Sequence, residues 1–185
     1  DWIQIKRDEA FKIGSSQVTE ALAHSDAKLF FITTPNNPTG TTTSLGTIEE
    51  LASRAMKIGA TVIVDEAYAE FSAEPSAVTL ISKYPNILVS RTMSKAFAFA
   101  GGRLGYLIAD PKVIQAMQLV RLPYHISSLT QAAALAALSR AATLESDVLQ
   151  IRSSRDEIAA ELTRLGLTVI PSDANFLLFG GFATS

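Results

Sequence analysis

One segment of the sequence places a lysine among hydroxyl side chains, two adjacent glycines and an arginine. This segment, residues 90–103 (SRTMSKAFAFAGGR), directly follows the apolar run at residues 87–89. Lys95 is followed by alternating alanines and phenylalanines, among which an ammonium group is expected to be poorly solvated. Because desolvation lowers the pKa of a lysine, such a side chain is suited to Schiff-base chemistry with an aldehyde.

The groups around this lysine are suited to binding a phosphate. Thr92 and Ser94 supply hydroxyls, and Arg103 supplies a planar cation that can grip two oxygens at once. A lysine that can bond to an aldehyde, beside groups that can hold a phosphate, indicates pyridoxal 5'-phosphate as a cofactor. The alternative is a solvated loop lysine in an ordinary turn, with hydroxyls that only stabilise that turn.

Two further polar clusters follow apolar runs nearer the N-terminus. Residues 34–40 (TPNNPTG) contain two prolines and a final glycine, which fix the backbone and make Asn37 a directional hydrogen-bond donor. Asp65 and Tyr68 follow the next run, and a carboxylate placed directly after a buried strand needs a partner. A plain solvated turn is the alternative for the first cluster, and a neighbouring lysine is the alternative partner for Asp65.

The elements that position these clusters alternate between strands and helices. Apolar runs at residues 28–33, 61–64 and 87–90 predict strands, and the first is of the kind covered on both faces of a parallel sheet. A helix capped by Thr47 and ended by Gly59 is expected between the first two strands. In an open α/β sheet ligands bind at the carboxyl ends of the strands, so the three clusters are expected to converge.

The remaining periodicity predicts more helices and strands on both sides of this unit. The expected elements are an edge strand at residues 2–7, helices at 16–24, 113–122, 127–138 and 145–165, and strands at 104–109, 167–170 and 175–179.

Composition excludes several classes of function. The 185 residues are 48% hydrophobic and 18% charged, as in a globular protein, and no apolar run approaches the ~20 residues of a membrane span. A net charge of −2 gives no reason to expect nucleic-acid binding. The absence of cysteine fits the cytoplasm. His24 and His125 are far apart, so no metal site is expected.

If the clusters converge, each candidate residue has a role in the chemistry of this cofactor. Lys95 would bond to the cofactor aldehyde and later act as the general acid and base that moves a substrate proton. Asp65 would pair with the ring nitrogen and keep it protonated, so that the ring can accept electrons. Tyr68 and Asn37 would hydrogen-bond the ring hydroxyl oxygen. The phosphate would be bound by Thr92, Ser94 and Arg103.

Taken together, these motifs resemble the pyridoxal phosphate-dependent aminotransferases of fold type I. The resemblance is carried by the segments NNPTG at 36–40, DEAY at 65–68, SKAF at 94–97 and GGR at 101–103. It implies a three-layer α/β/α fold with a mainly parallel sheet, formed by a large cofactor-binding domain at residues 1–143. Residues 144–185 would begin a smaller α+β domain, and the enzyme would be a homodimer.

Within that superfamily, three segments resemble the branch that acts on histidinol phosphate. They are TMSKAF at 92–97, RLPYH at 121–125 and PSDANF at 171–176. This resemblance implies exchange of an amino group between histidinol phosphate and 2-oxoglutarate in histidine biosynthesis. The alternatives are an aromatic amino acid aminotransferase of the same fold and a non-catalytic aminotransferase-like binding module. A nucleotide-binding α/β domain is disfavoured because the sequence has no P-loop signature.

The chain matches only the middle of the family pattern. The aromatic residue that stacks on the cofactor ring, a glycine-containing phosphate turn and the arginine that binds the substrate carboxylate belong to other parts of that pattern. Residues 1–185 by themselves are therefore expected to be inactive.

Overall fold

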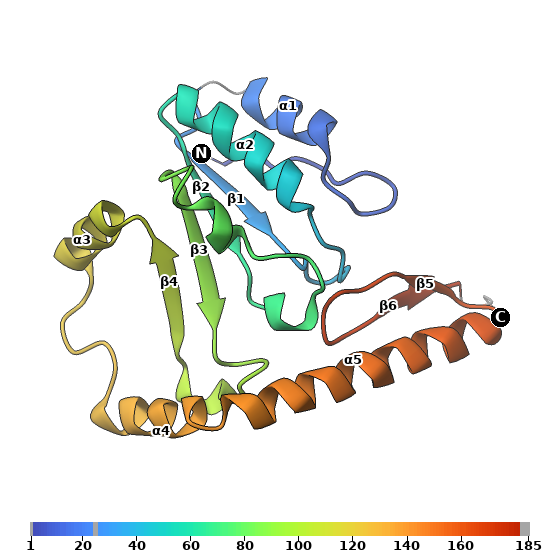
Figure 1. Ribbon diagram of the computed structural model, residues 1–185. Helices are drawn as coiled ribbons and strands as arrows, with labels where there is room; N and C mark the ends of the chain where they lie inside the picture. The colour runs from blue at the N-terminus through green and yellow to red at the C-terminus, as the bar shows by residue number, and fades with distance from the viewer. Residues whose placement is uncertain (1, 24–25, 182–185) are drawn as a thin grey trace.

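The computed structural model describes residues 2–23 and 26–181, which form a four-stranded sheet, a two-stranded sheet and helices around them (Figure 1). The larger sheet has the strand order β1-β2-β3-β4. Strands β1 (Leu29–Thr33), β2 (Thr61–Asp65) and β3 (Ile87–Thr92) are parallel, and β4 (Gly105–Ala109) is antiparallel to β3. The predicted α/β class and mainly parallel sheet are confirmed.

Helix α2 (Leu45–Lys57) forms the crossover between β1 and β2, as the sequence predicts. Its N-cap is Ser44 rather than Thr47, because the Ser44 hydroxyl accepts a hydrogen bond from the backbone N–H of Thr47 at 3.2 Å. Gly59 follows the helix with φ of 67°, the left-handed conformation that ends many helices. The predicted end of this helix is therefore correct, and its predicted cap is three residues too late.

The hydrophobic core lies between the sheet and a layer formed by α1 (Ser15–Ala23) and α2. Side chains from both layers are fully or nearly fully buried there: Val18, Ile32, Ile48, Leu51, Ala52, Val62, Val64, Ile87 and Val89. This packing helps to fix the parallel part of the sheet, because α2 packs against β2 and α1 packs against α2.

The opposite face of β1 is not covered by the described residues. Phe30 and Ile32 are buried, but Leu29 is 54% exposed and Phe31 is 71% exposed. The prediction of a strand covered on both faces is therefore wrong for β1 in this chain. Of the three expected layers, the described residues form the sheet and one helical layer, while α5 (Ala141–Arg164) runs along the carboxyl edge of the parallel strands (Figure 1).

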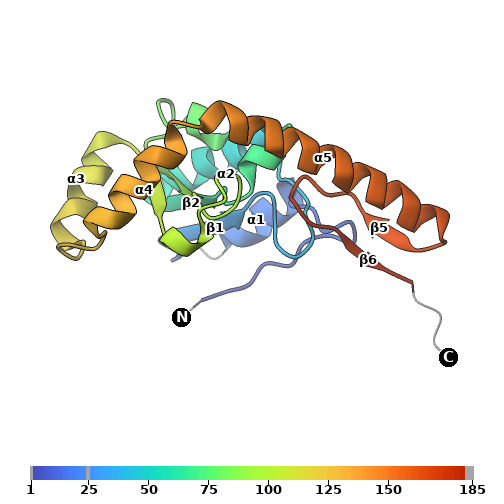
Figure 2. The same ribbon diagram turned by 90° about the horizontal axis from the view of Figure 1, so that it is seen from below.

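The chain after β4 is mostly helical. Asp110 caps α3 (Pro111–Val120), and Ser127 caps α4 (Ser128–Leu138), which leads into α5. The hairpin of β5 (Thr168–Ile170) and β6 (Leu178–Gly180) then lies beside the second half of α5 (Figure 2). Helix α5 begins four residues before the predicted start at residue 145, and β6 begins three residues after its predicted start at 175.

The N-terminal segment differs from the prediction. Residues 2–7 form no strand, and the Arg7 guanidinium instead donates to the carbonyl oxygen of Thr33 at 3.1 Å and to that of Phe11 at 3.2 Å. This segment is thus held by a side chain rather than by a strand ladder. His24, at the end of the first predicted helix, lies outside the described residues. In the part of the chain that is described, no helix is both long and apolar enough to cross a membrane.

Candidate active site at the carboxyl edge of the sheet

The register of the parallel strands brings three chain segments to one edge of the sheet. Thr33 at the end of β1 is opposite Asp65 at the end of β2, and Asp65 is opposite Ser90 in β3. The backbone N–H of Thr34 also donates to the carbonyl oxygen of Asp65 at 2.9 Å. The three predicted polar clusters therefore begin at neighbouring positions, as the sequence pattern predicts.

Tyr68 is contacted by residues of the other two clusters. The Asn37 side-chain amide donates a hydrogen bond to the Tyr68 hydroxyl at 3.1 Å, and the Lys95 ammonium lies 5.3 Å from the centre of the Tyr68 ring. Such a distance allows a cation–π interaction. Three predicted site residues from three different loops are thus brought together.

Lys95 is exposed, which differs from the expected burial among apolar neighbours. The chain leaves the sheet after Thr92, and within residues 90–103 Met93 is the one fully buried residue. The alternating phenylalanines and alanines after Lys95 form an irregular loop and a 3-10 turn, η3 (Ala100–Gly102), so they do not enclose the ammonium group.

Thr92 and Ser94 form a compact hydroxyl cluster at the end of β3. The Thr92 Oγ1 atom accepts a hydrogen bond from the Ser94 backbone N–H at 3.1 Å and lies 3.0 Å from the Ser94 hydroxyl. The backbone N–H of Met93 donates to the carbonyl oxygen of Leu104, the residue after Arg103. The hydroxyl cluster and the start of β4 are therefore tied together.

Arg103 is exposed, and its Nη1 atom donates to the carbonyl oxygen of Ala100 at 3.2 Å. Its backbone has φ of 50°, a left-handed conformation that costs a non-glycine residue about 1–2 kcal/mol. Arg103 therefore directly precedes Leu104, whose carbonyl oxygen is bonded to the hydroxyl cluster. The Arg103 guanidinium itself bonds within its own loop.

Asp65 lies at the end of β2 with its side chain partly buried. Its Oδ1 atom accepts a hydrogen bond from the backbone N–H of Ala67 at 3.1 Å. Among the described residues it forms no ion pair, so the structural lysine partner considered from the sequence is not found there.

A buried ion pair that the sequence interpretation missed lies directly behind these residues. Glu66 is 2% exposed, and its carboxylate accepts hydrogen bonds from Arg91 at 2.7 Å, the Ser76 hydroxyl at 2.7 Å and the Ala77 backbone N–H at 2.7 Å. Arg91 also pairs with Glu70 at 3.2 Å. The signal in the sequence was the adjacent pair Asp65 and Glu66, because successive side chains of a strand point to opposite faces.

Glu70 completes this group with one oxygen, Oε2, buried without a hydrogen-bond partner. Burial raises the pKa of the Glu70 carboxyl above its ordinary value, and the nearby Arg91 opposes that rise. A raised pKa means that the neutral form of Glu70 suits the fold better than the charged form does, so its contribution to stability falls as the pH rises through that pKa.

Residues 172–176, in the loop between β5 and β6, pack onto the same edge of the sheet. The backbone N–H of Asp173 donates to the carbonyl oxygen of Gly40 at 2.8 Å, and the Thr42 hydroxyl donates to the Asp173 carboxylate at 2.5 Å. The Phe176 ring meets the Tyr68 ring edge to face, with centres 5.1 Å apart and planes at 86°. Phe176 is therefore a neighbour of the candidate site that the sequence interpretation did not assign.

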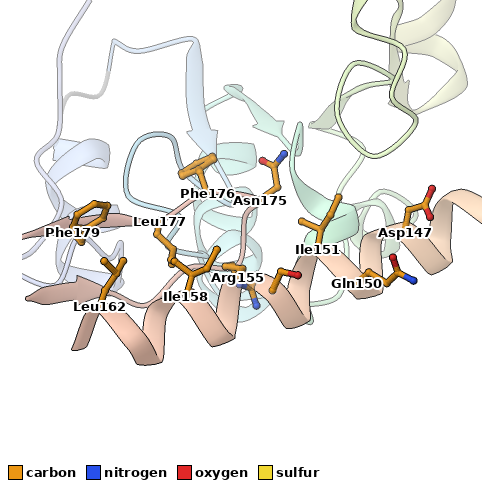
Figure 3. Close-up of a pocket in the computed structure, with 11 residues that line it drawn as sticks. Asp147, Gln150, Ile151, Arg155, Ile158, Leu162, Asn175, Phe176, Leu177 and Phe179 are labelled. Atoms are coloured by element: carbon orange, nitrogen blue, oxygen red, sulfur yellow. The ribbon is translucent and has the colours of Figure 1, made fainter. Parts of the chain in front are cut away.

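A cavity of about 540 Å³ lies between α5 and the hairpin (Figure 3). Phe176, Leu177 and Phe179 line it from the hairpin side, while Ile158 and Leu162 project from α5. This cavity does not contain Lys95 or Asp65, and it borders the candidate site through Phe176, which contacts Tyr68. Within the described residues, no group of acidic and histidine side chains is arranged to hold a metal ion.

Comparison with known protein families identifies the family to which the chain belongs. The family model described as aminotransferase class I and II matches residues 1–185, which is the full length of the sequence. The chain belongs to this family.

Individual relatives give a more specific likeness. The chain is 51% identical over 184 residues to a histidinol-phosphate aminotransferase of Nocardia farcinica, covering 99% of the chain and 47% of the relative. The histidinol-phosphate aminotransferase of Sinorhizobium meliloti, solved in complex with pyridoxal-5'-phosphate, matches with a TM-score of 0.84 and 28% identity over 96% of the chain and 48% of that structure. The chain thus spans about half the length of these relatives.

The same fold also occurs in an enzyme with another name. An aspartate aminotransferase double mutant of Thermus thermophilus matches with a TM-score of 0.81 and 26% identity, covering 96% of the chain and 49% of that structure. Structural likeness therefore identifies the fold, and the higher sequence identity carries the more specific information.

The close approach of the 172–176 loop to Gly40 yields a first prediction. Gly40 has φ of 74°, and a Cβ atom there would collide with the Ser172 side chain, so Gly40→Ala should destabilise the protein by more than the about 1–2 kcal/mol of backbone strain alone. Gly59→Ala is the matched control, because Gly59 has φ of 67° and open space around it. Chemical denaturation of both variants would measure the difference, and equal losses of stability would contradict the predicted collision.

The buried pair of Glu66 and Arg91 yields a second prediction. Glu66→Ala would leave the Arg91 guanidinium with one carboxylate and the Ser76 and Ala77 donors with none, so the free energy of unfolding should fall by about 3–5 kcal/mol. Glu49→Ala is a suitable control, because Glu49 pairs with Lys83 at the surface, where solvent weakens the ion pair, so its loss should cost much less than the loss of Glu66. Similar losses for both variants would show that the Glu66 pair does not hold the strand ends.

Proposed function

We propose that this protein is a histidinol-phosphate aminotransferase, which exchanges an amino group between histidinol phosphate and 2-oxoglutarate in histidine biosynthesis. The observation that carries the proposal is the 51% identity to the Nocardia farcinica enzyme across 99% of the chain. Because the chain spans about half of that relative, the activity is proposed for a protein that contains these residues together with the rest of the family pattern.

The residues at the carboxyl edge fit pyridoxal 5'-phosphate by their chemistry. An exposed primary amine at Lys95 lies next to the Asn37 and Tyr68 pair, and a carboxylate at Asp65 and a hydroxyl cluster at Thr92 are on the same edge. A structure of a relative contains this cofactor, which supports the same assignment. When bound, the cofactor supplies an electron sink for the carbon that exchanges its amino group.

Each residue of the chain then has a proposed role. Lys95 would hold the cofactor through its Nζ atom and would carry the proton to and from the substrate carbon. Asp65 would keep the ring nitrogen protonated, because its carboxylate has no cationic partner among the described residues. Asn37 and Tyr68 would hydrogen-bond the ring hydroxyl oxygen. The phosphate would be bound by Thr92, Ser94 and Arg103.

The assembly and organisation proposed for the protein follow from the same assignment. A homodimer is supported by exposed apolar side chains around α3 and α4, including Leu119, Leu122 and Tyr124, which is 100% exposed. Two separate sheets support a large domain at residues 1–143 and a smaller one that begins at 144, with α5 crossing the boundary. A cytoplasmic location is proposed because the substrates of amino-acid biosynthesis are small soluble metabolites.

The role of Lys95 can be tested directly. In the whole protein, Lys95→Ala should abolish the visible absorption of the bound cofactor and the covalent label that borohydride reduction leaves on the protein. Lys83→Ala is the control, because Lys83 is a surface lysine paired with Glu49. Persistence of the label in Lys95→Ala, mapped by mass spectrometry, would assign the chemistry to another lysine.

The substrate can be tested by competition. With 2-oxoglutarate as acceptor, kcat/KM for histidinol phosphate should exceed that for phenylalanine, because the proposed enzyme acts on the phosphorylated amino alcohol. Initial rates with both donors on one preparation would measure the ratio. A ratio that favours phenylalanine would identify an aromatic amino acid aminotransferase instead.

A further inference from the structure

We propose that Phe176 is a positioning residue for Tyr68, and that it holds the Tyr68 hydroxyl at the Asn37 amide. The inference rests on the proposed function, because it assigns a task to Tyr68 in the site of an aminotransferase. Phe176 belongs to the loop between β5 and β6, so the proposal makes the second sheet a part of the site rather than a separate attachment.

The first support is the geometry of the two rings. The Phe176 and Tyr68 rings are nearly perpendicular, at 86°, with centres 5.1 Å apart, which is the edge-to-face arrangement that aromatic pairs prefer. Tyr68 is half-buried, and Asn37 and Lys95 contact it from exposed positions. Phe176 is therefore the apolar side chain that restricts the tilt of the Tyr68 ring.

The second support is that Phe176 is itself held firmly. The Ser172 hydroxyl donates to the Phe176 carbonyl oxygen at 2.7 Å and accepts from the backbone N–H of Ala174 at 3.1 Å, which closes the loop on itself. Arg155 on α5 donates to the carbonyl oxygen of Ala174 at 3.0 Å, and Ala174 is fully buried. A ring on a backbone fixed in this way can set the position of a neighbouring ring.

The third support is that the loop and the Asn37 turn are joined. Asp173 bonds to Gly40, the last residue of the turn that contains Asn37, and to Thr42, which lies two residues beyond it. Two of the partners of the Tyr68 side chain, Asn37 at its hydroxyl and Phe176 at its ring, are therefore held in one hydrogen-bonded unit. A substitution of Phe176 is therefore expected to change the geometry of the hydrogen bond between Asn37 and Tyr68.

The test compares Phe176→Leu, which removes the ring, with Phe176→Tyr, which keeps it. Leu177→Ala is the matched control, because Leu177 is the next residue and lines the same cavity beside α5. In the cofactor-free protein, NMR signals of the Asn37 side-chain amide and of the Tyr68 ring should move in Phe176→Leu. They should stay close to their original positions in Phe176→Tyr and in Leu177→Ala.

A second readout uses the whole protein with pyridoxal 5'-phosphate bound. Phe176→Leu should raise the pH midpoint of the cofactor's visible absorption, in the same direction as Tyr68→Phe but by less, since the hydroxyl remains present. It should also lower kcat by about two- to tenfold, the fold-change that corresponds to one aromatic pair. In a Tyr68→Phe background, Phe176→Leu should shift the midpoint no further, because the hydroxyl it positions is gone.

Two results would overturn the inference while leaving the proposed function in place. One is unchanged Asn37 and Tyr68 signals in Phe176→Leu. The other is an equal shift of the absorption midpoint by Phe176→Leu with and without the Tyr68 hydroxyl, which would show that Phe176 acts through general packing of the hairpin. An unmodified whole protein that binds no cofactor would instead overturn both proposals.

Discussion

The parallel register of β1, β2 and β3 is the constraint on which the candidate site depends. Parallel strands end at the same edge of a sheet, and here Thr33, Asp65 and Ser90 are side by side at that edge. The loops after β1 and β2 therefore start at neighbouring positions, and the loop after β3 starts two residues beyond Ser90, after Thr92, at the same edge. A shift of β2 by a single residue would place the Asp65 side chain on the opposite face, because side chains alternate along a strand.

The ion pair of Glu66 and Arg91 holds this register on the far side of the strands. Asp65 and Glu66 are adjacent, and so are Arg91 and Thr92, so the pair connects the two strand ends from which the site residues extend. The carboxylate of Glu66 is almost entirely buried and receives several donors, which offsets the cost of removing it from water.

Sequence reasoning located the strands and their polar ends because an apolar run followed by turn residues is a local signal. It did not show that β1 is open on one face, since a continuous apolar run looks the same whether one or two layers cover it. It placed the cap of α2 at Thr47, but residues 41–44 carry hydroxyls too, and only the backbone path selects Ser44.

Contacts between distant segments were the main features that the sequence could not supply. The meeting of Tyr68 with Phe176 depends on how the β5–β6 hairpin packs against the Asn37 turn, and no periodicity encodes that packing. The exposure of Lys95 could not be predicted from the sequence for a similar reason. Its neighbours are apolar, but the direction in which the loop leaves β3 decides whether they surround the ammonium group.

The length of α5 has a mechanical consequence for the hairpin. A helix of 24 residues extends about 36 Å, so a tilt of about 5° at one end would displace the other end by about 3 Å. This displacement is about the length of a hydrogen bond, so attachment to α5 alone would not fix the position of the hairpin. Asp173 bonds directly to Gly40 and Thr42, which follow β1, so the hairpin is also attached to the larger sheet without α5. Small bending of α5 can therefore occur without separating the hairpin from that sheet.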